Sequence, residues 1–214
     1  MCGRYSQTQM LSKLAERFAV KRVPEDIKPR YNIAPTQHAP VIVHLGERSL
    51  EQYRWGLIPS WAKDPSIGYK MINARGETVN QKPSFRRPFQ RSRCLAISDG
   101  FYEWKKEGKI KTPMRIALKS REPFAFAGLW DCWIDPEGKE VKSFSIVTTA
   151  ANAVLKPIHD RMPVILREED EAIWLDPEVK ADLLMKLIVP YPEEAMEAYA
   201  VSSVVNSARN DHPD

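Results

Sequence analysis

Seventeen prolines, spread along 214 residues, divide this chain into short segments. Proline lacks the backbone N–H that helix interiors and central strands need, so each one limits the element around it. The segments between them are rich in Val, Ile, Phe, Tyr and Trp and are bounded by Gly, Pro or Asp, which is typical of β-strands. The pattern predicts hairpin turns at Gly108 and Gly138 and strands at 40–45, 49–55, 92–98, 100–105, 112–118, 123–129, 142–149 and 163–166.

A few segments favour helices instead. Ser6-x-x-Gln9 resembles a capping box before an i, i+3, i+4, i+7 apolar stripe, which predicts a helix over 7–19. Short helices are expected at 150–156, at 168–175 and from Asp176-Pro177 to about 187. Residues 21–39 are expected to form an extended loop broken by prolines. The prediction is an α+β fold, a single domain over 1–214 with a mainly antiparallel, barrel-like β core and flanking helices.

Composition indicates a soluble globular protein, with 43% hydrophobic and 28% charged residues. A chain of this length buries about 70% of its unfolded surface, so it needs no disulfide or metal to fold. No apolar run is long enough to span a bilayer, and MCGRYSQTQM has no signal core, so we expect a cytoplasmic protein. Three cysteines without a CxxC pair argue against a disulfide framework or a zinc ribbon. Motifs for nucleotide triphosphates and dinucleotides are absent from the sequence, and no cofactor is expected.

Charge is divided unevenly along the chain. Residues 1–166 contain 28 Lys and Arg against 16 Asp and Glu, whereas residues 167–214 contain 4 against 12. The window 81–93 holds five cationic side chains and no acid. Such a basic face suits a polyanion such as nucleic acid, although a simply solvated basic surface is an equal alternative. The acidic region, about 167–200, is expected to be helical and to pack on the rest as a solvated cap, and the alternative is a negative flank that keeps DNA on the other face.

Cys2 is the most informative single position. Aminopeptidases remove the initiator Met before a small residue, so the mature chain is expected to begin with Cys2. Its α-amine, with an ordinary pKa of about 7.7–8.0, is roughly 10–20% free base at neutral pH and can attack an aldehyde. The neighbouring thiol can then close a five-membered thiazolidine. The alternatives are an acyl-transfer nucleophile with its own amine as base, or an idle cysteine at a frayed terminus.

Three further residues could carry acid–base or orienting chemistry. His159 in IHDRMP can shuttle protons near neutral pH, and Glu103 in the aromatic segment GFYEW can have a raised pKa. Asn73 in INARGE follows a strand-like segment, where an amide can orient a nucleophile or simply form a turn. Cys94 and Cys132 lie in apolar contexts and are expected to be buried and inert. A zinc site from the three cysteines and His159 has no supporting spacing.

Taken together, these segments resemble the SRAP (SOS response-associated peptidase) family over nearly the whole chain. The matching segments, in order, are MCGR (1–4), YNIAPTQ (31–37), WGLIPSW (55–61), INARGET (72–78), CLAISDGFYEWK (94–105), FAGLW (126–130), SIVTTAAN (145–152) and IHDRMPVIL (158–166). The resemblance implies binding to single-stranded DNA, or a single-strand/double-strand junction, at an abasic site, and a covalent cross-link through Cys2. It implies that Asn73 positions Cys2, that Glu103 assists ring opening and imine chemistry, and that His159 moves protons. It implies no metal or organic cofactor.

The resemblance also implies a set of DNA contacts. An abasic site offers no base to read, so the protein must hold phosphates and shape. The phosphate-binding cations that match family positions are Arg4, Arg75 and Arg161. Neutral hydrogen bonds are expected from Asn32 and Thr148. Stacking on the flanking bases is expected from Trp61 and Trp104. Some members have two adjacent aromatics where this chain has Trp61-Ala62, so a wedge that unstacks DNA is expected to be weaker here.

Three functions from different classes remain open at this point. The first is covalent capture of abasic sites, with weak strand cleavage by β-elimination as a secondary activity. The second is a thiol peptidase, or autocleavage after Met1, which the family name suggests. The third is a passive single-strand binder in which Cys2 is incidental. Nothing in the sequence demands more than a monomer.

Overall fold

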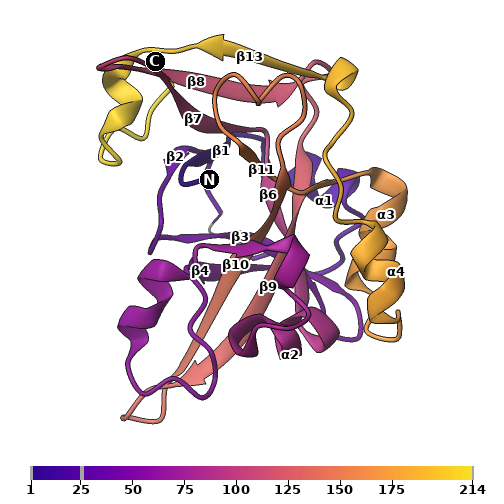
Figure 1. The fold of residues 1–214 in the computed structure, drawn as a ribbon. Helices are drawn as coiled ribbons and strands as arrows, with labels where there is room; N and C mark the ends of the chain where they lie inside the picture. The colour runs from indigo at the N-terminus through magenta and orange to yellow at the C-terminus, as the bar shows by residue number, and fades with distance from the viewer. Residues whose placement is uncertain (1, 25–26, 214) are drawn as a thin grey trace.

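The computed structural model describes residues 2–24 and 27–213, which form strands with a few flanking helices (Figure 1). The strands are β1 (Tyr5–Gln7), β2 (Arg30–Ile33), β3 (His38–His44), β4 (Arg48–Trp55), β5 (Asn73–Arg75), β6 (Arg93–Ser98), β7 (Gly100–Glu107), β8 (Ile110–Leu118), β9 (Phe124–Ile134), β10 (Glu140–Ala150), β11 (Arg161–Pro163), β12 (Ile165–Leu166) and β13 (Met196–Ala200). The α-helices are α1 (Leu11–Arg17), α2 (Pro83–Arg91), α3 (Glu168–Leu175) and α4 (Ala181–Lys186), and the 3-10 helices are η1 (Pro65–Lys70), η2 (Gly76–Thr78), η3 (Glu193–Ala195) and η4 (Ser203–Asn206).

Five strands close into a barrel. In order around the ring, β10 pairs with β4, β4 with β3, β3 with β6, β6 with β9, and β9 returns to β10. Only the β10–β4 step of this ring is parallel. Closure removes the unpaired edges that an open sheet would expose. The expected α+β class with a mainly antiparallel, barrel-like core is therefore confirmed.

A second sheet lies across the top of the barrel in Figure 1, with the order β13-β8-β7-β1-β2. All of its pairings are antiparallel. The hairpin turns predicted at Gly108 and Gly138 are confirmed: both residues have positive φ, 61° and 84°, which glycine adopts without steric cost. They join β7 to β8 and β9 to β10.

The barrel strands bury both of their faces. Alternate residues enter two different clusters, as Val41 and Val43 do on one side and Ile42 on the other. One cluster lies toward the second sheet and contains Tyr5. The Tyr5 ring packs edge-on against Trp55, with the two ring centroids 5.0 Å apart. The other contains buried side chains of all four α-helices. This double burial explains why the strand segments are so strongly apolar.

The helix expected over 7–19 is shorter, and its capping box is absent. Residues 5–7 form β1, and the Ser6 hydroxyl donates to the Asp99 carboxylate at 2.6 Å, so it is not available as a cap. The helix begins only after Met10, which has extended backbone and no side-chain cap. The expected loop over 21–39 is also partly wrong, because 30–33 pairs with β1 as β2.

Two other expected helices differ, again for local reasons. Residues 153–158 form successive turns rather than a helix, with the Asn152 side chain accepting from the backbone N–H of Leu155. Asp176 accepts from the N–H of Glu178 in a turn of the same kind, which delays α4 to Ala181. The helix over 168–175 is confirmed as α3.

The acidic region is not helical throughout. It contains α3, α4 and η3, but it ends in β13, which pairs with β8 along its whole length. Conversely, α2 forms in the basic window where no helix was expected, and it holds Pro88 in its interior. None of the helices in the described part of the chain is long and apolar enough to span a membrane.

Candidate active site

Cys2 lies in the apolar cluster under the second sheet, three residues before the start of β1. Its side chain is completely buried, and its Sγ lies 3.9 Å from the carbonyl oxygen of Arg4. Burial raises the pKa of the thiol far above its ordinary value, and the negative charge of Glu103 raises it further. The thiol is therefore neutral at physiological pH, unlike the thiolate of a typical cysteine nucleophile.

Asn73 reaches Cys2 directly. Its side-chain amide donates a hydrogen bond to the Cys2 carbonyl oxygen at 2.8 Å. Asn73 is the first residue of β5 rather than a turn residue, and it pairs with Ile146 of β10 in parallel register. Pairing with the barrel strand β10 therefore sets the position from which the Asn73 amide reaches Cys2.

Glu103 faces Cys2 from the middle of β7. Strand alternation puts Glu103 and Phe101 on the inner face of the second sheet, which is turned toward the barrel. Tyr102 and Trp104 point to the opposite, outer face. Only 6% of Glu103 is exposed. Burial raises the pKa of its carboxyl group, and the charge of Asp160 raises it further. Glu103 therefore holds its proton to a higher pH than an ordinary glutamate.

His159 lies between the turns at 153–158 and β11. Its Nδ1 accepts a hydrogen bond from the backbone N–H of Arg161 at 3.0 Å and lies 2.8 Å from a carboxylate oxygen of Asp160. Nδ1 accepts from Arg161 only when it carries no proton, and donates to Asp160 only when it carries one. Burial lowers the pKa of His159, and the charge of Arg161 lowers it further while that of Asp160 opposes the shift. The ring is accordingly neutral at pH 7.

Arg161 and Arg75 flank the end of β10. The register pairs Thr148 with Arg75 on β5, and Ala150 with Arg161 on β11. The Arg161 guanidinium forms a bidentate ion pair with Glu77 and also donates to the Thr148 carbonyl oxygen at 2.8 Å. Arg75 is exposed. The Thr148 side chain is completely buried, so a direct hydrogen bond from it to DNA stays a prediction.

Arg4, Asn32 and Trp104 meet on the outer face of the second sheet. Arg4 donates to the Asn32 side-chain oxygen and to the Val205 carbonyl oxygen, both at 2.7 Å, and lies 5.8 Å from the Trp104 ring centroid. The Trp104 indole donates to Asn206 at 2.7 Å. Asn32 is buried, and a direct contact between it and DNA stays a prediction.

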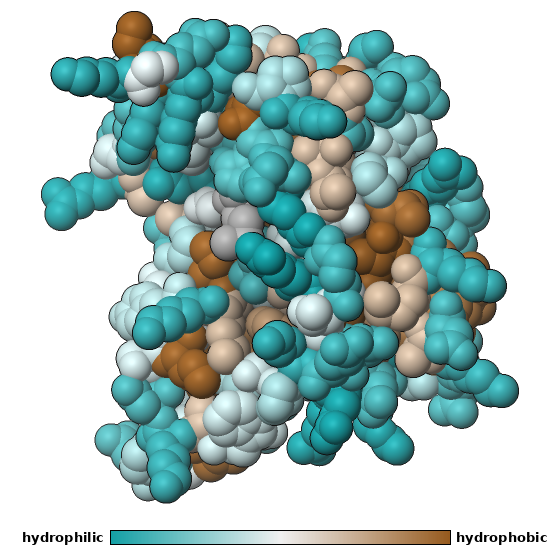
Figure 2. Space-filling view, in the orientation of Figure 1, coloured by the Kyte–Doolittle hydropathy of each residue, from teal (hydrophilic) through white to brown (hydrophobic). Residues whose placement is uncertain are grey.

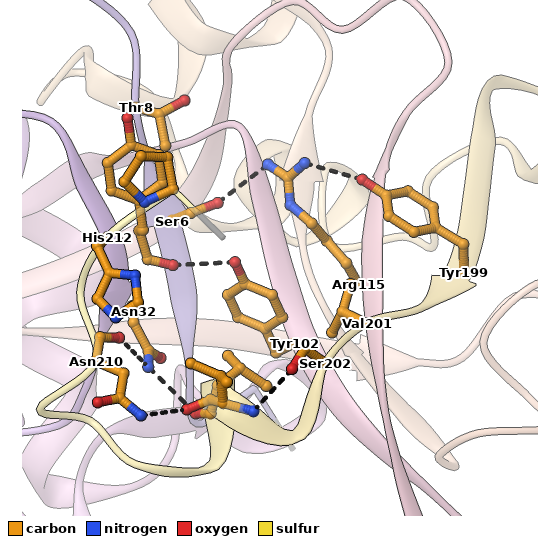
Figure 3. A pocket seen from close by; sticks show the side chains of 14 residues that line it. Ser6, Thr8, Asn32, Tyr102, Arg115, Tyr199, Val201, Ser202, Asn210 and His212 are labelled. Atoms are coloured by element: carbon orange, nitrogen blue, oxygen red, sulfur yellow. Dashed lines mark hydrogen bonds between the residues drawn. The ribbon is translucent and has the colours of Figure 1, made fainter.

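A C-terminal strap, residues 201–213, crosses this outer face. The Asn32 amide donates to the carbonyl oxygens of Val205, Ser207 and Asn210. Figure 3 shows Asn32 beside Asn210 of the strap. Between strap and sheet lies a cavity of about 310 Å³, lined also by Tyr102, Arg115 and Tyr199.

The strap and the neighbours Glu77 and Asp160 are the parts of the site that the sequence did not reveal. Glu77 and Asp160 do lie inside the matched segments INARGET and IHDRMPVIL. Each is a charged residue within two positions of a predicted site residue, and this proximity was the available signal.

Trp61 is a surface residue. It lies in the loop between β4 and η1 and is 58% exposed. The loop is held by Trp133, whose indole donates to the Ala62 carbonyl oxygen at 2.7 Å. Figure 2 shows a hollow at the left edge of the molecule, between the upper part that carries β7 and β8 and the lower part that carries β4. Within residues 2–24 and 27–213, no three His, Cys, Asp or Glu side chains gather as metal ligands, so the zinc alternative gains no support.

Comparison with known proteins shows which family this chain belongs to. The family model "SOS response associated peptidase (SRAP)" matches residues 1–208. The chain belongs to the SRAP family. This SRAP protein is 48% identical to the abasic site processing protein YoqW of Bacillus subtilis, over 100% of this chain and 98% of the relative. It is 36% identical to the abasic site processing protein HMCES of Xenopus tropicalis, over 87% of this chain and 65% of that protein.

Solved structures share the fold of this SRAP protein. A crystal structure of a protein from Bacteroides thetaiotaomicron matches with a TM-score of 0.91 and 31% identity, covering 98% of this chain and 97% of the other. A Bordetella bronchiseptica protein matches with a TM-score of 0.82 and 25% identity, covering 94% and 100%. The site residues come from four separate parts of this shared fold: the chain start, β5, β7 and the segment before β11.

Proposed function

We propose that this protein processes DNA damage by capturing abasic sites in single-stranded DNA covalently, through Cys2 after removal of Met1. The observation that carries the proposal is the hydrogen bond from Asn73 to the Cys2 carbonyl oxygen, with the buried Glu103 beside the same residue. The names of the relatives, abasic site processing proteins, support the same substrate class. Shielding of the lesion is the expected outcome for the DNA.

The proposed chemistry is an aldehyde condensation in two steps. The free α-amine of Cys2 attacks C1′ of the ring-opened deoxyribose, and the carbonyl oxygen leaves as water, giving an imine. The sulfur then adds to the imine carbon while the thiol proton moves to the nitrogen, which closes a thiazolidine. The balance is one water lost per cross-link. A neutral thiol suits this order, because the amine and not the sulfur makes the first attack.

Acid–base roles follow from the environments of two side chains. Glu103, with its raised pKa, can donate a proton to the sugar oxygen as the ring opens or to the departing hydroxyl. His159, with its lowered pKa, can accept and return protons near neutral pH. Asn73 is a positioning residue that orients Cys2. β-Elimination from the imine accounts for weak lyase activity as a secondary reaction.

The expected DNA contacts surround these groups. Arg4, Arg75 and Arg161 are the proposed phosphate ligands, with Trp61 and Trp104 stacking on flanking bases. In this proposal Asn32 and Thr148 act chiefly by holding Arg4 and Arg161, whose side chains they contact. No metal or cofactor is part of the proposal, and the protein acts as a monomer in the cytoplasm.

Intact mass spectrometry tests the proposal directly. Protein that lacks Met1 is incubated with a single-stranded oligonucleotide carrying one abasic site. We expect the mass to rise by that of the oligonucleotide less one water, in a product that survives heat and denaturant. Cys2→Ala abolishes this product while single-strand binding persists. Protein that retains Met1 forms no thiazolidine, because the nitrogen of Cys2 is then an amide.

The other two functions have distinct outcomes in the same assay. Equal affinity of Met-free protein for intact and abasic oligonucleotides, with no mass shift, would establish a passive binder. A Cys2→Ser chain that keeps Met1 in cells without aminopeptidase action, where wild type loses it, would favour self-processing by a peptidase. The positioning role of Asn73 predicts a capture rate about 10-fold lower in Asn73→Ala, from loss of one hydrogen bond, with unchanged affinity for undamaged DNA.

A further inference from the structure

Helix α2 presents a row of cations that the proposed chemistry does not use. Pro83, Arg86, Arg87, Gln90 and Arg91 are exposed, whereas Pro88 and Phe89 are buried. The exposed positions follow the i, i+3, i+4, i+7, i+8 spacing of one helix face. Lys82, just before the helix, is exposed as well. We call Lys82, Arg86, Arg87 and Arg91 the α2 basic face.

The α2 basic face is not neutralised by the protein itself. Among the ion pairs of the described residues, none includes any of its four side chains. Other arginines of this chain are paired, as Arg17 is with Glu171 and Arg115 with Asp99. Four unpaired cations on about two helical turns repel one another, and a polyanion relieves this repulsion.

The spacing of the three arginines fits a sugar-phosphate backbone. Arg86 and Arg91 are separated by about 7.5 Å along the helix axis, at 1.5 Å per residue. Along the axis of double-stranded DNA, two nucleotide steps of one strand span about 6.8 Å. Arg86 and Arg87 on one turn and Arg91 on the next can therefore reach neighbouring phosphates, and arginine suits this role through its bidentate donors.

A short stretch of chain connects the α2 basic face to Arg75 of the candidate site. Arg75 ends β5, η2 follows at once, and six residues separate Arg75 from Lys82. Val79 in this connection and Phe89 of α2 are both buried in the same apolar cluster, which fixes the helix to the barrel. Figure 2 shows hydrophilic side chains projecting at the lower part of the face, where Figure 1 draws α2.

We propose that the α2 basic face is a second DNA-binding surface, which holds the phosphates of the strand flanking the abasic site. The proposal rests on the proposed function for the position of the lesion. Its contribution is to affinity and not to the covalent step. The contact is independent of base sequence, because phosphates carry no sequence information.

Affinity measured in a Cys2→Ala background separates this surface from the chemistry. The test variant adds Arg86→Gln, Arg87→Gln and Arg91→Gln, and the matched control adds Lys21→Gln, Lys180→Gln and Lys186→Gln, three other exposed cations. Abasic oligonucleotides with progressively longer 5′ or 3′ flanks are titrated at several salt concentrations. We expect the arginine variant to bind long oligonucleotides about 10-fold or more weakly at low salt, with the salt slope reduced by about 2. The control and the parent bind alike.

Three outcomes are decisive. Loss of affinity that appears only beyond a certain flank length supports a flank contact. Equal binding by the arginine variant and the control at every length overturns the proposal, provided that both melt at the parent temperature. Cross-linking of the Met-free chain with Cys2 intact is scored separately on denaturing gels. If no cross-link forms but affinity still depends on flank length, the proposed function is refuted and the DNA-binding surface is not.

Discussion

At the scale of one residue, burial raises the pKa of the Glu103 carboxyl group. It lies on a strand between aromatic neighbours, and the expectation of a raised pKa came from that context alone. The structure adds the reason, which is nearly complete burial beside Cys2 and Asp160. A carboxyl group in water has a pKa of about 4.3, and removal of water disfavours its charged form.

Glu103 therefore predicts a pH-dependent stability. Its pKa is higher in the folded than in the unfolded chain, so its favourable contribution is complete below the unfolded pKa and is lost as pH rises through the folded pKa. We expect Glu103→Gln to melt at nearly the wild-type temperature at pH 4, and above it by a margin that grows toward neutral pH. Thermal unfolding across this range checks the prediction. Glu107→Gln, an exposed change on the same strand, serves as control, and a margin that shrinks as pH rises would contradict it.

At the scale of elements, Arg93 joins three of them. It is buried at the start of β6, and its guanidinium donates to the carbonyl oxygens of Phe89, Trp174 and Asp176 at 2.7, 2.6 and 2.5 Å. These carbonyls lie at the ends of α2 and α3, where backbone acceptors lack intrahelical partners. The Arg93 side chain alone therefore satisfies three backbone carbonyl acceptors that would otherwise need other donors.

Removal of this side chain should be costly. Arg93→Met leaves these three carbonyls without their donor, two of them in buried hydrogen bonds, and we expect about 3 kcal/mol or more of lost unfolding free energy, a fall in Tm of about 6–12 °C. Arg91→Met, an exposed change two residues earlier, should cost under about 0.5 kcal/mol. Urea and thermal unfolding of both variants measure the difference. Similar losses in the two would mean that the buried hydrogen bonds contribute little.

At the scale of the whole molecule, the C-terminal strap ties the last residues to the first strands. Asp211 accepts from the backbone N–H groups of Tyr31 and Asn32 at 2.6 and 2.9 Å and forms an ion pair with Arg30. The strap also supplies the Val205 carbonyl that holds Arg4. A contact between residues about 180 positions apart therefore sets the orientation of a proposed phosphate ligand.

Asp211→Ala should release the strap without unfolding the barrel. We expect faster amide hydrogen exchange confined to residues 203–211 and β2, together with weaker binding of abasic DNA, because Arg4 loses a fixed partner. Arg209→Ala, an exposed change in the strap, is the control and should alter neither. Exchange that accelerates throughout the barrel would show instead that the strap is part of the global folding unit.

The sequence by itself determined the parts of this protein that depend on neighbouring residues. Runs rich in Val, Ile, Phe, Tyr and Trp, together with turn glycines, specified the barrel strands and both hairpins, and α3 followed from its local pattern. The segments YNIAPTQ, INARGET and IHDRMPVIL identified the family and its candidate residues. Only the tertiary structure decided the rest, since β2 and β13 owe their strand state to partners far along the chain, and Ser6 loses its capping role to Asp99. The meeting of residues 2, 73 and 103 is likewise a property of the closed barrel and the sheet across it, because side chains that distant in sequence share a site only when strand register brings them together.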